Sequence, residues 1–302
     1  MRPTAELARL LGRVVNRTHR LLRPVPRRRD LALVRRFTLQ STALGRRAHF
    51  LAYVPQDAAG ALPPNTPPLP VLYLLHGATG RWYDFADHAH RTLRALAHQH
   101  RLVLVTPDGG VGHDDGWYLD TDLLPHSNHA SHLLDEVLPA VEAALPVSRT
   151  RRGIAGISMG GHGAITLALR HPGRFASASS MSGVLDLTPA RDRPALVARL
   201  GPHDDNRARW AAHSALDLIT AHPERARDLP LLITVGDADH WTPANRAFHL
   251  RLVELGIDHL YRETPGDYHD WAHWRRELPR HIAWHARQLA GPELTARSTD
   301  PR

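Results

Sequence analysis

The sequence of 302 residues predicts an α/β fold, with a mainly parallel central sheet covered by helices on both faces. Apolar runs of strand length alternate with segments of helical periodicity, which is the pattern of right-handed crossover connections. Several of these runs are continuously apolar, as expected for strands buried on both faces. The third observation is the pattern Gly156-x-Ser158-x-Gly160, which lies between an apolar run and a helical segment. With 42% hydrophobic residues, the chain can bury the core of one large domain.

The positive charge of the chain is concentrated near its N-terminus. All 38 basic residues are arginine, and the formal net charge is +8. Residues 1–36 contain 11 arginines against Glu6 and Asp30, whereas the remainder of the chain is almost neutral. The excess charge therefore belongs to an N-terminal arm and not to the body, and no nucleic-acid partner is expected.

Within this arm, residues 4–22 have the pattern of a basic amphipathic helix, followed by a linker rich in proline and arginine at 24–29. Two interpretations stay open: weak attachment to an anionic membrane or a protein, or an extension that packs on its own domain or is frayed in solvent. No window approaches the ~18 consecutive apolar residues of a membrane span, and arginines interrupt the segment where a secretory signal needs an apolar core. We therefore expect a cytoplasmic protein, with peripheral membrane association as the alternative.

The expected elements follow in a regular order. Extended segments at 36–41 and 48–54 flank a turn near Gly45 and predict an antiparallel strand pair. The runs expected to form the other strands are 71–75, 102–106, the run that ends before Ser158, 175–183, 231–235 and 259–263. Helices are expected over 89–98, 131–144, the segment after Ser158, 244–255 and 271–289. The loop 111–128 and the segment 184–228 are the least patterned, and 184–228 suits a small cap or insertion over a site.

The pattern around Ser158 predicts a nucleophile elbow, a sharp turn that presents a serine between a strand and a helix. Such a turn brings the strand and the helix close together, so side chains at positions 156 and 160 would clash where glycine does not. A serine hydroxyl is a poor nucleophile at neutral pH and needs a neutral imidazole as base, oriented by a carboxylate. His269 is the candidate base among 23 histidines, because it follows the final strand and precedes the last helix. For the carboxylate, Asp237 and Asp239 both follow a buried strand.

Acyl-transfer chemistry also needs backbone donors for the negative charge on the carbonyl oxygen. The N–H of Met159, at the start of the elbow helix, is one candidate. The loop after the first parallel strand supplies the other, the N–H of Ala78, with Gly77 allowing the backbone to approach the substrate. His76 is then expected to be structural. Side chains expected near the mouth of an acyl or alcohol pocket are Trp82, Asp84, Trp117, Tyr118 and His162.

Six motifs in this order resemble the esterase D-type putative esterase family of the α/β-hydrolase superfamily. These motifs are Leu74-Leu75-His76-Gly77, Thr106-Pro107-Asp108-Gly109, Trp117-Tyr118-x-Asp120, Gly156-Ile157-Ser158-Met159-Gly160-Gly161, Gly236-x-x-Asp239 and His269-Asp270-Trp271-x-x-Trp274. The resemblance runs from about Arg36 to Leu289, and relatives in this family include S-formylglutathione hydrolases, feruloyl, acetyl and tributyrin esterases, and mycolyltransferases. It implies an α/β-hydrolase fold and a Ser158, Asp239 and His269 triad, with Asp239 preferred to Asp237 because the family's acid falls three residues after the glycine that closes the strand. The arm lies outside the resemblance, and the expected division is a basic arm and linker at 1–36, a catalytic domain at 37–290 and a polar tail at 291–302.

The function expected from these residues is a serine carboxylesterase that hydrolyses small to medium acyl esters through an acyl-enzyme. The alternatives are an acyltransferase that uses an alcohol or sugar acceptor, and a catalytically silent hydrolase fold used for binding. The chain has no cysteine, which excludes disulfides and a thiolate nucleophile. It also lacks the cysteine commonly found near the oxyanion loop of S-formylglutathione hydrolases, which counts against that activity. We expect a small-molecule ester as substrate and no cofactor or metal; the patterns do not indicate an oligomeric state.

Overall fold

The computed structural model describes residues 32–55, 67–110 and 115–290. Most of the basic arm, the connection 56–66, part of the loop 111–128 and the C-terminal tail lie outside the described residues. No helix in the described part of the chain is long and apolar enough to cross a membrane.

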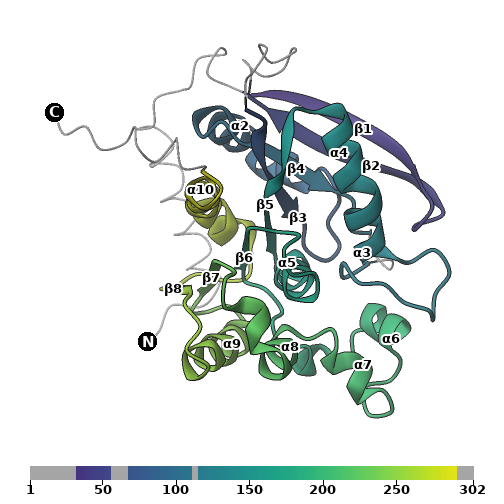
Figure 1. The fold of residues 1–302 in the computed structure, drawn as a ribbon. Helices are drawn as coiled ribbons and strands as arrows, with labels where there is room; N and C mark the ends of the chain where they lie inside the picture. The colour runs from purple at the N-terminus through teal and green to yellow at the C-terminus, as the bar shows by residue number, and fades with distance from the viewer. Residues whose placement is uncertain (1–31, 56–66, 111–114, 291–302) are drawn as a thin grey trace, which may run out of the picture.

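The core of the fold is one sheet of eight strands in the order β1-β2-β4-β3-β5-β6-β7-β8 (Figure 1). The strands are β1 Leu33–Ser41, β2 Arg46–Val54, β3 Leu69–Leu75, β4 Val103–Pro107, β5 Val147–Ile157, β6 Ser177–Met181, β7 Leu231–Gly236 and β8 Leu260–Thr264. β1 pairs with β2, and β2 with β4, in antiparallel fashion. The six strands β4, β3, β5, β6, β7 and β8 are parallel to one another. The predicted fold class is therefore confirmed, and β1 begins at Leu33, earlier than the expected Arg36.

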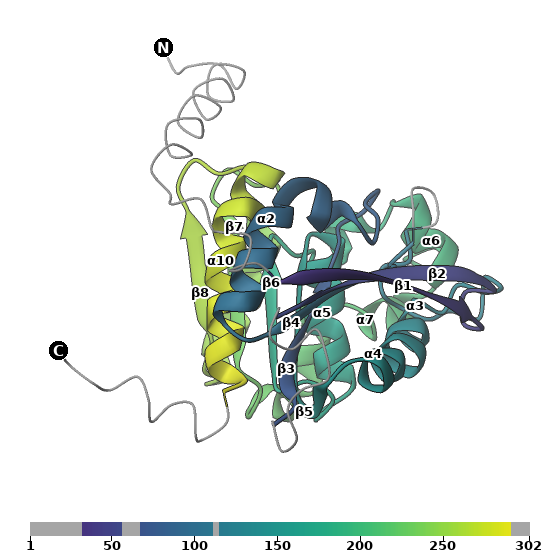
Figure 2. The ribbon, with the colours of Figure 1, turned by 90° about the horizontal axis from the view of Figure 1, so that it is seen from above.

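Among the described residues, two helices cover one face of the sheet, and most of the other helices lie on the opposite face (Figures 1 and 2). α2 (Asp84–Gln99) and α10 (Trp271–Gln288) pack against each other and against the sheet on the first face. On the second face are α3 (His129–Ser131), the π-helical segment η4 (His132–Val137), α4 (Leu138–Ala144), α5 (Met159–Arg170) and α9 (Thr242–Glu254). The α2 helix begins at Asp84, five residues before the expected start, whereas the other expected helix ends lie within two residues of the observed ones.

Burial on both faces explains the continuously apolar strands. Successive residues of a strand point to opposite faces. In β3, Tyr73 joins the core cluster beneath α4 and α5, while its neighbour Leu74 joins the cluster beneath α2 and α10. A strand with two covered faces therefore has buried side chains at every position, as β3 does.

The insertion expected at 184–228 lies between β6 and β7 and consists of short helical segments. They are η5 Thr188–Ala190, α6 Pro194–Leu200, α7 Arg207–Ala211, α8 Ala215–Ala221 and η6 Pro223–Ala226. α8 packs on α5 and α9, so it belongs to the helical layer, while α6 and α7 lie at the periphery in Figure 1. The insertion thus extends the second layer and leaves its outer part beside the carboxyl ends of the strands.

A buried polar network joins α10 to the sheet. The ring nitrogens of His285 lie 2.7 Å from Ser177 Oγ and 2.8 Å from Ser179 Oγ. His281 lies 2.8 Å from the same Ser179 Oγ and 3.0 Å from Thr234 Oγ1. Burial lowers the pKa of His285 to about 3 and the pKa of His281 well below its usual value. Both histidines are therefore neutral structural residues. Their ring nitrogens hydrogen-bond to buried hydroxyl groups of β6 and β7, which have no access to water.

Candidate active site

Ser158 occupies the turn between β5 and α5 in a strained backbone conformation. Its φ is 54° and its ψ is −118°, which a residue with a side chain adopts at a cost of about 1–3 kcal/mol. A Cβ atom at Gly156 would overlap the Gly160 carbonyl, and one at Gly160 would overlap the Leu75 carbonyl. The two glycines thus permit the close packing of β5, α5 and β3 that this turn requires, as the sequence predicted.

His269 reaches Ser158 from the loop between β8 and α10. Its Nε2 atom lies 2.8 Å from Ser158 Oγ, and its Nδ1 atom lies 2.8 Å from Asp239 Oδ2. With the proton on Nδ1, His269 donates to the carboxylate and accepts the hydrogen bond of the serine hydroxyl. Asp270 forms the N-cap of α10 by accepting hydrogen bonds from the Ala272 and His273 N–H groups. This cap fixes the start of the helix at Trp271, two residues after His269.

The structure distinguishes the two aspartates that follow β7. The Asp239 side chain is fully buried, and its Oδ1 atom accepts a hydrogen bond of 2.8 Å from the Trp241 N–H. Burial by itself would raise the pKa of Asp239, but the hydrogen bond and charge of His269 and the Trp241 N–H lower it below its usual value. Asp237 instead accepts a hydrogen bond from the Gly266 N–H in the loop after β8. Asp239, and not Asp237, therefore contacts the imidazole, and Asp237 contacts the neighbouring loop.

The loop after β3 lies beside Ser158, because β3 and β5 are adjacent and parallel. A Cβ atom at Gly77 would lie 3.3 Å from the Ser158 Cβ, which shows how closely the two backbones approach. Thr79 has a left-handed φ of 61°, and its N–H donates to Asp115 Oδ1 at 2.8 Å. Within the described residues, neither the Ala78 N–H nor the Met159 N–H donates a hydrogen bond. Their role as oxyanion donors stays a prediction.

The side chain of His76 hydrogen-bonds to the backbone of this loop and of the loop after β4. Its Nδ1 atom lies 2.9 Å from the Gly77 carbonyl oxygen, and its Nε2 atom accepts the Gly109 N–H at 3.0 Å. Burial lowers the pKa of His76, although the Gly77 carbonyl and nearby aspartates oppose that effect. Both ring nitrogens are used within the fold, in keeping with the structural role expected for this side chain.

Three residues expected at the pocket mouth are deeply buried. Trp117 and His162 meet edge to face with ring centroids 5.5 Å apart. His162 Nε2 donates to the His213 carbonyl at 2.9 Å, and burial lowers the pKa of His162 to about 3. The Tyr118 hydroxyl donates to the His76 carbonyl at 3.3 Å. These contacts are made inside the fold, and direct contact of the three side chains with substrate stays a prediction.

The other two expected pocket residues lie toward α2. Trp82 is half-buried beside His49, with ring centroids 5.3 Å apart, and the Arg36 guanidinium lies 5.7 Å from its ring centroid. Asp84 lies against Gly80, where an added Cβ atom would overlap its carboxylate. Burial raises the pKa of Asp84, while His76 and His88 oppose the rise. Trp82 therefore contacts β1 and β2, and Asp84 supports the loop that carries Ala78.

Near the three hydrogen-bonded residues lie Trp274, which the sequence analysis named only as part of a motif, and His240, Trp241 and Arg193, which it did not single out. The Trp274 ring meets the His269 ring edge to face at 5.1 Å, and the His240 ring lies 4.6 Å from it. Arg193 lies over the rings of Trp117 and Trp241. His240 and Trp241 directly follow Asp239, so their place in the sequence could have indicated that they lie near the site. Arg193 comes from the unpatterned insertion, where no sequence pattern indicates its position.

Asp239, His240 and His269 also form a group whose potential metal-ligand atoms lie within 4.8 Å of one another. The hydrogen bond between the buried Asp239 carboxylate and His269 accounts for this spacing. We therefore assign no metal to the group.

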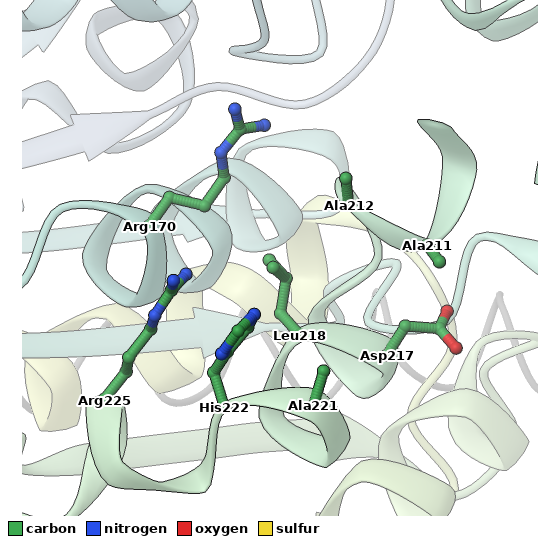
Figure 3. A pocket seen from close by; sticks show the side chains of 8 residues that line it. All are labelled: Arg170, Ala211, Ala212, Asp217, Leu218, Ala221, His222 and Arg225. Carbon is green, nitrogen blue, oxygen red and sulfur yellow. The ribbon is translucent and has the colours of Figure 1, made fainter. Parts of the chain in front are cut away.

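A cavity of about 470 Å³ lies at the far end of α5 from Ser158. Figure 3 shows Arg170, Leu218, His222 and Arg225 around it. Because α5 spans 12 residues, this end of the helix is about 18 Å from the serine along the axis. The cavity is thus separate from the candidate active site.

Comparisons with known proteins show the family to which the chain belongs. The family model "Putative esterase" matches residues 41–285. The chain is 27% identical over 275 residues to S-formylglutathione hydrolase of Bos taurus, covering 84% of this chain and 93% of that protein. It is 28% identical to the enzyme of that name from Paracoccus denitrificans, covering 83% and 91%. The solved S-formylglutathione hydrolase of Agrobacterium tumefaciens superimposes with a TM-score of 0.74 at 27% identity, covering 86% of this chain and 96% of that one. The chain therefore belongs to the Putative esterase family of the α/β-hydrolase superfamily and is a carboxylic ester hydrolase.

Proposed function

We propose that the chain hydrolyses small to medium acyl esters through an acyl-enzyme formed on Ser158. The observation that carries the proposal is the continuous hydrogen-bonded chain from Asp239 through His269 to Ser158, with 2.8 Å at each step. A serine, an imidazole and a buried carboxylate in this arrangement form the machinery of serine-dependent acyl transfer.

In the first half-reaction, Ser158 Oγ attacks the ester carbonyl carbon while His269 Nε2 takes the hydroxyl proton. The Asp239 carboxylate stabilises the imidazolium, and the N–H groups of Ala78 and Met159 donate to the oxyanion. As the tetrahedral intermediate collapses, the ester C–O bond breaks and the alcohol leaves with the proton from His269. The acyl group is then bound to Ser158.

In the second half-reaction, His269 removes a proton from water, and the resulting hydroxide attacks the acyl carbon. The bond to Ser158 Oγ breaks, the serine regains its proton from His269, and the carboxylic acid is released. The same residues would transfer the acyl group to an alcohol or sugar acceptor that replaces water. Product analysis with acceptors present separates the two outcomes.

The proposal is tested with 4-nitrophenyl acetate and butyrate and with a fluorophosphonate probe. Ser158→Ala should lose turnover and labelling, because no other group replaces the attacking oxygen. Ser148→Ala is the matched control, since Ser148 lies near the other end of β5 and hydrogen-bonds only locally. Equal turnover by wild type and Ser158→Ala would remove Ser158 from the mechanism.

The natural ester is not identified by the relatives' names. The proteins from Bos taurus and Paracoccus denitrificans are named S-formylglutathione hydrolases. We propose a different small ester for this chain, because it lacks the cysteine that is common near the oxyanion loop of those enzymes. An ester panel that includes S-formylglutathione tests this directly, and efficient hydrolysis of the thioester would contradict it.

A further inference from the structure

Arg193 lies between two buried indole rings beside the candidate active site. Its guanidinium carbon is 5.4 Å from the ring centroid of Trp241 and 6.0 Å from that of Trp117. Both tryptophans are buried, whereas Arg193 is exposed. The aromatic faces therefore hold a solvent-accessible cation in place.

The backbone of Arg193 is also fixed. Its N–H donates to the Ala190 carbonyl, and its own carbonyl accepts the N–H groups of Leu196 and Val197, each at 3.0 Å. Pro194 follows directly and restricts Arg193 to an extended conformation, with a ψ of 120°. The position of the cation is thus set by the fold of the insertion between β6 and β7.

Trp241 and Trp117 both lie next to residues around Ser158. The backbone N–H of Trp241 donates to the Asp239 carboxylate at 2.8 Å. The Trp117 ring contacts the ring of His162, and the backbone N–H of His162 donates to the Ser158 carbonyl at 3.0 Å. Burial, His269 and Arg193 together lower the pKa of His240, so Arg193 and His269 act on the same imidazole.

Arg193 has no carboxylate within 4.0 Å among the residues that the structure describes. Asp115 lies within electrostatic range, but its Oδ1 atom already accepts the Thr79 N–H. Nearby Arg191, in contrast, has Asp192 at 3.9 Å. A guanidinium is always charged and suits the planar geometry of a carboxylate.

We propose that Arg193 is an anion-recognition residue of this active site and selects esters that carry a second, ionised carboxylate. The proposal rests on the Ser158-dependent ester hydrolysis proposed above and narrows its substrate class. The carboxylate belongs either to the acyl group or to the alcohol of the ester, and both sources present the same chemistry to the guanidinium.

Two matched pairs of esters test the two sources. Mono-4-nitrophenyl adipate and 4-nitrophenyl hexanoate differ by a carboxylate at the end of the acyl chain. 4-Acetoxybenzoate and its methyl ester differ by a carboxylate on the alcohol. The readout is the ratio of kcat/KM for the anionic ester to that for the neutral ester, which does not depend on the active fraction of a preparation.

For one of the pairs, Arg193→Gln should lower this ratio at least tenfold, equivalent to about 1.4 kcal/mol. Arg193→Lys should retain part of the preference because it keeps the charge but loses the planar fork. Arg191→Gln, the control on the same insertion, should keep the wild-type ratio. Rising ionic strength should lower the wild-type ratio, because the interaction is exposed to solvent.

An unchanged ratio for both pairs in Arg193→Gln would overturn the proposal while leaving Ser158-dependent hydrolysis of the neutral esters intact. If wild type hydrolyses none of the four esters, the proposed function fails, and binding decides the role of Arg193. Tryptophan fluorescence of Ser158→Ala then gives the Kd of each ester, since Trp117 and Trp241 adjoin the guanidinium. A Kd for the anionic esters that Arg193→Gln does not raise in this background would overturn the proposal independently.

Discussion

The Oδ2 atom of Asp239 lies 2.8 Å from the Nδ1 atom of His269, on a carboxylate that has no exposed surface. Asp237, two residues earlier, hydrogen-bonds to the Gly266 N–H instead. The two carboxylates follow the same strand, and tertiary contacts assign them different tasks.

Replacing Asp239 with asparagine should lower kcat for 4-nitrophenyl acetate by roughly 10³–10⁴-fold, because an amide can stabilise the wrong imidazole tautomer and cannot stabilise the imidazolium. Asp237→Asn is the control and should retain kcat within a few-fold. Steady-state kinetics of both variants decide the matter. Comparable losses in the two would contradict the assignment of Asp239.

A methyl group at Gly160 should disrupt the elbow, because it overlaps the Leu75 carbonyl, which belongs to a central strand and cannot move aside. We expect Gly160→Ala to lose several kcal/mol of unfolding free energy or to fail to fold, in line with severe backbone strain. Gly173→Ala carries the same substitution in a turn where nothing lies within 4 Å. Its φ of 80° should limit the cost to about 1–2 kcal/mol. Urea unfolding compares the two, and a milder effect at Gly160 would refute the steric account.

Acid should destabilise the protein through its buried histidines. Burial lowers the pKa of His285 to about 3 in the folded state, whereas an unfolded histidine has a pKa of about 6.5. Between these values the unfolded chain binds more protons, so the free energy of unfolding falls as the pH falls below about 6.5, by up to about 1.4 kcal/mol per pH unit for this group. His281 should act in the same direction.

His285→Gln should therefore reduce the slope of unfolding free energy against pH between pH 4 and 6, on top of any loss of stability at neutral pH. The exposed His88, which stacks on Trp271, supplies the control His88→Gln. Urea titrations at several pH values give the slopes. An identical slope for wild type and His285→Gln would exclude this histidine as a source of acid sensitivity.

The N-cap of α10 should influence the position of His269. Asp270→Ala removes the acceptor for the Ala272 and His273 N–H groups and should cost about 1 kcal/mol of stability. It should also lower kcat more than it raises KM, since the base is one residue away. Asp270→Asn keeps a capping oxygen and should restore most of both properties. Wild-type kcat in Asp270→Ala would show that the cap does not position the base.

Much of the site followed from local patterns. Glycine at 156 and 160 predicted the elbow because only a residue without Cβ tolerates the approach of neighbouring backbones. The order of Ser158, the aspartates and His269 at strand ends indicated that they converge, since the carboxyl ends of parallel strands lie at one edge of the sheet. The polar contacts of Thr79 with Asp115 could not be predicted in the same way, because Asp115 lies in a loop without periodicity.

The sequence by itself determined the α/β architecture, the nucleophile turn and the candidate base, because strand and helix periodicity and glycine restrictions act over a few neighbouring residues. Only the tertiary structure decided that Asp239 rather than Asp237 faces His269. It also decided that both ring nitrogens of His76 hydrogen-bond to backbone groups, and that Arg193 lies between Trp117 and Trp241. Each of these depends on side chains brought together from distant loops, whose directions are set by strand register and packing rather than by any local pattern.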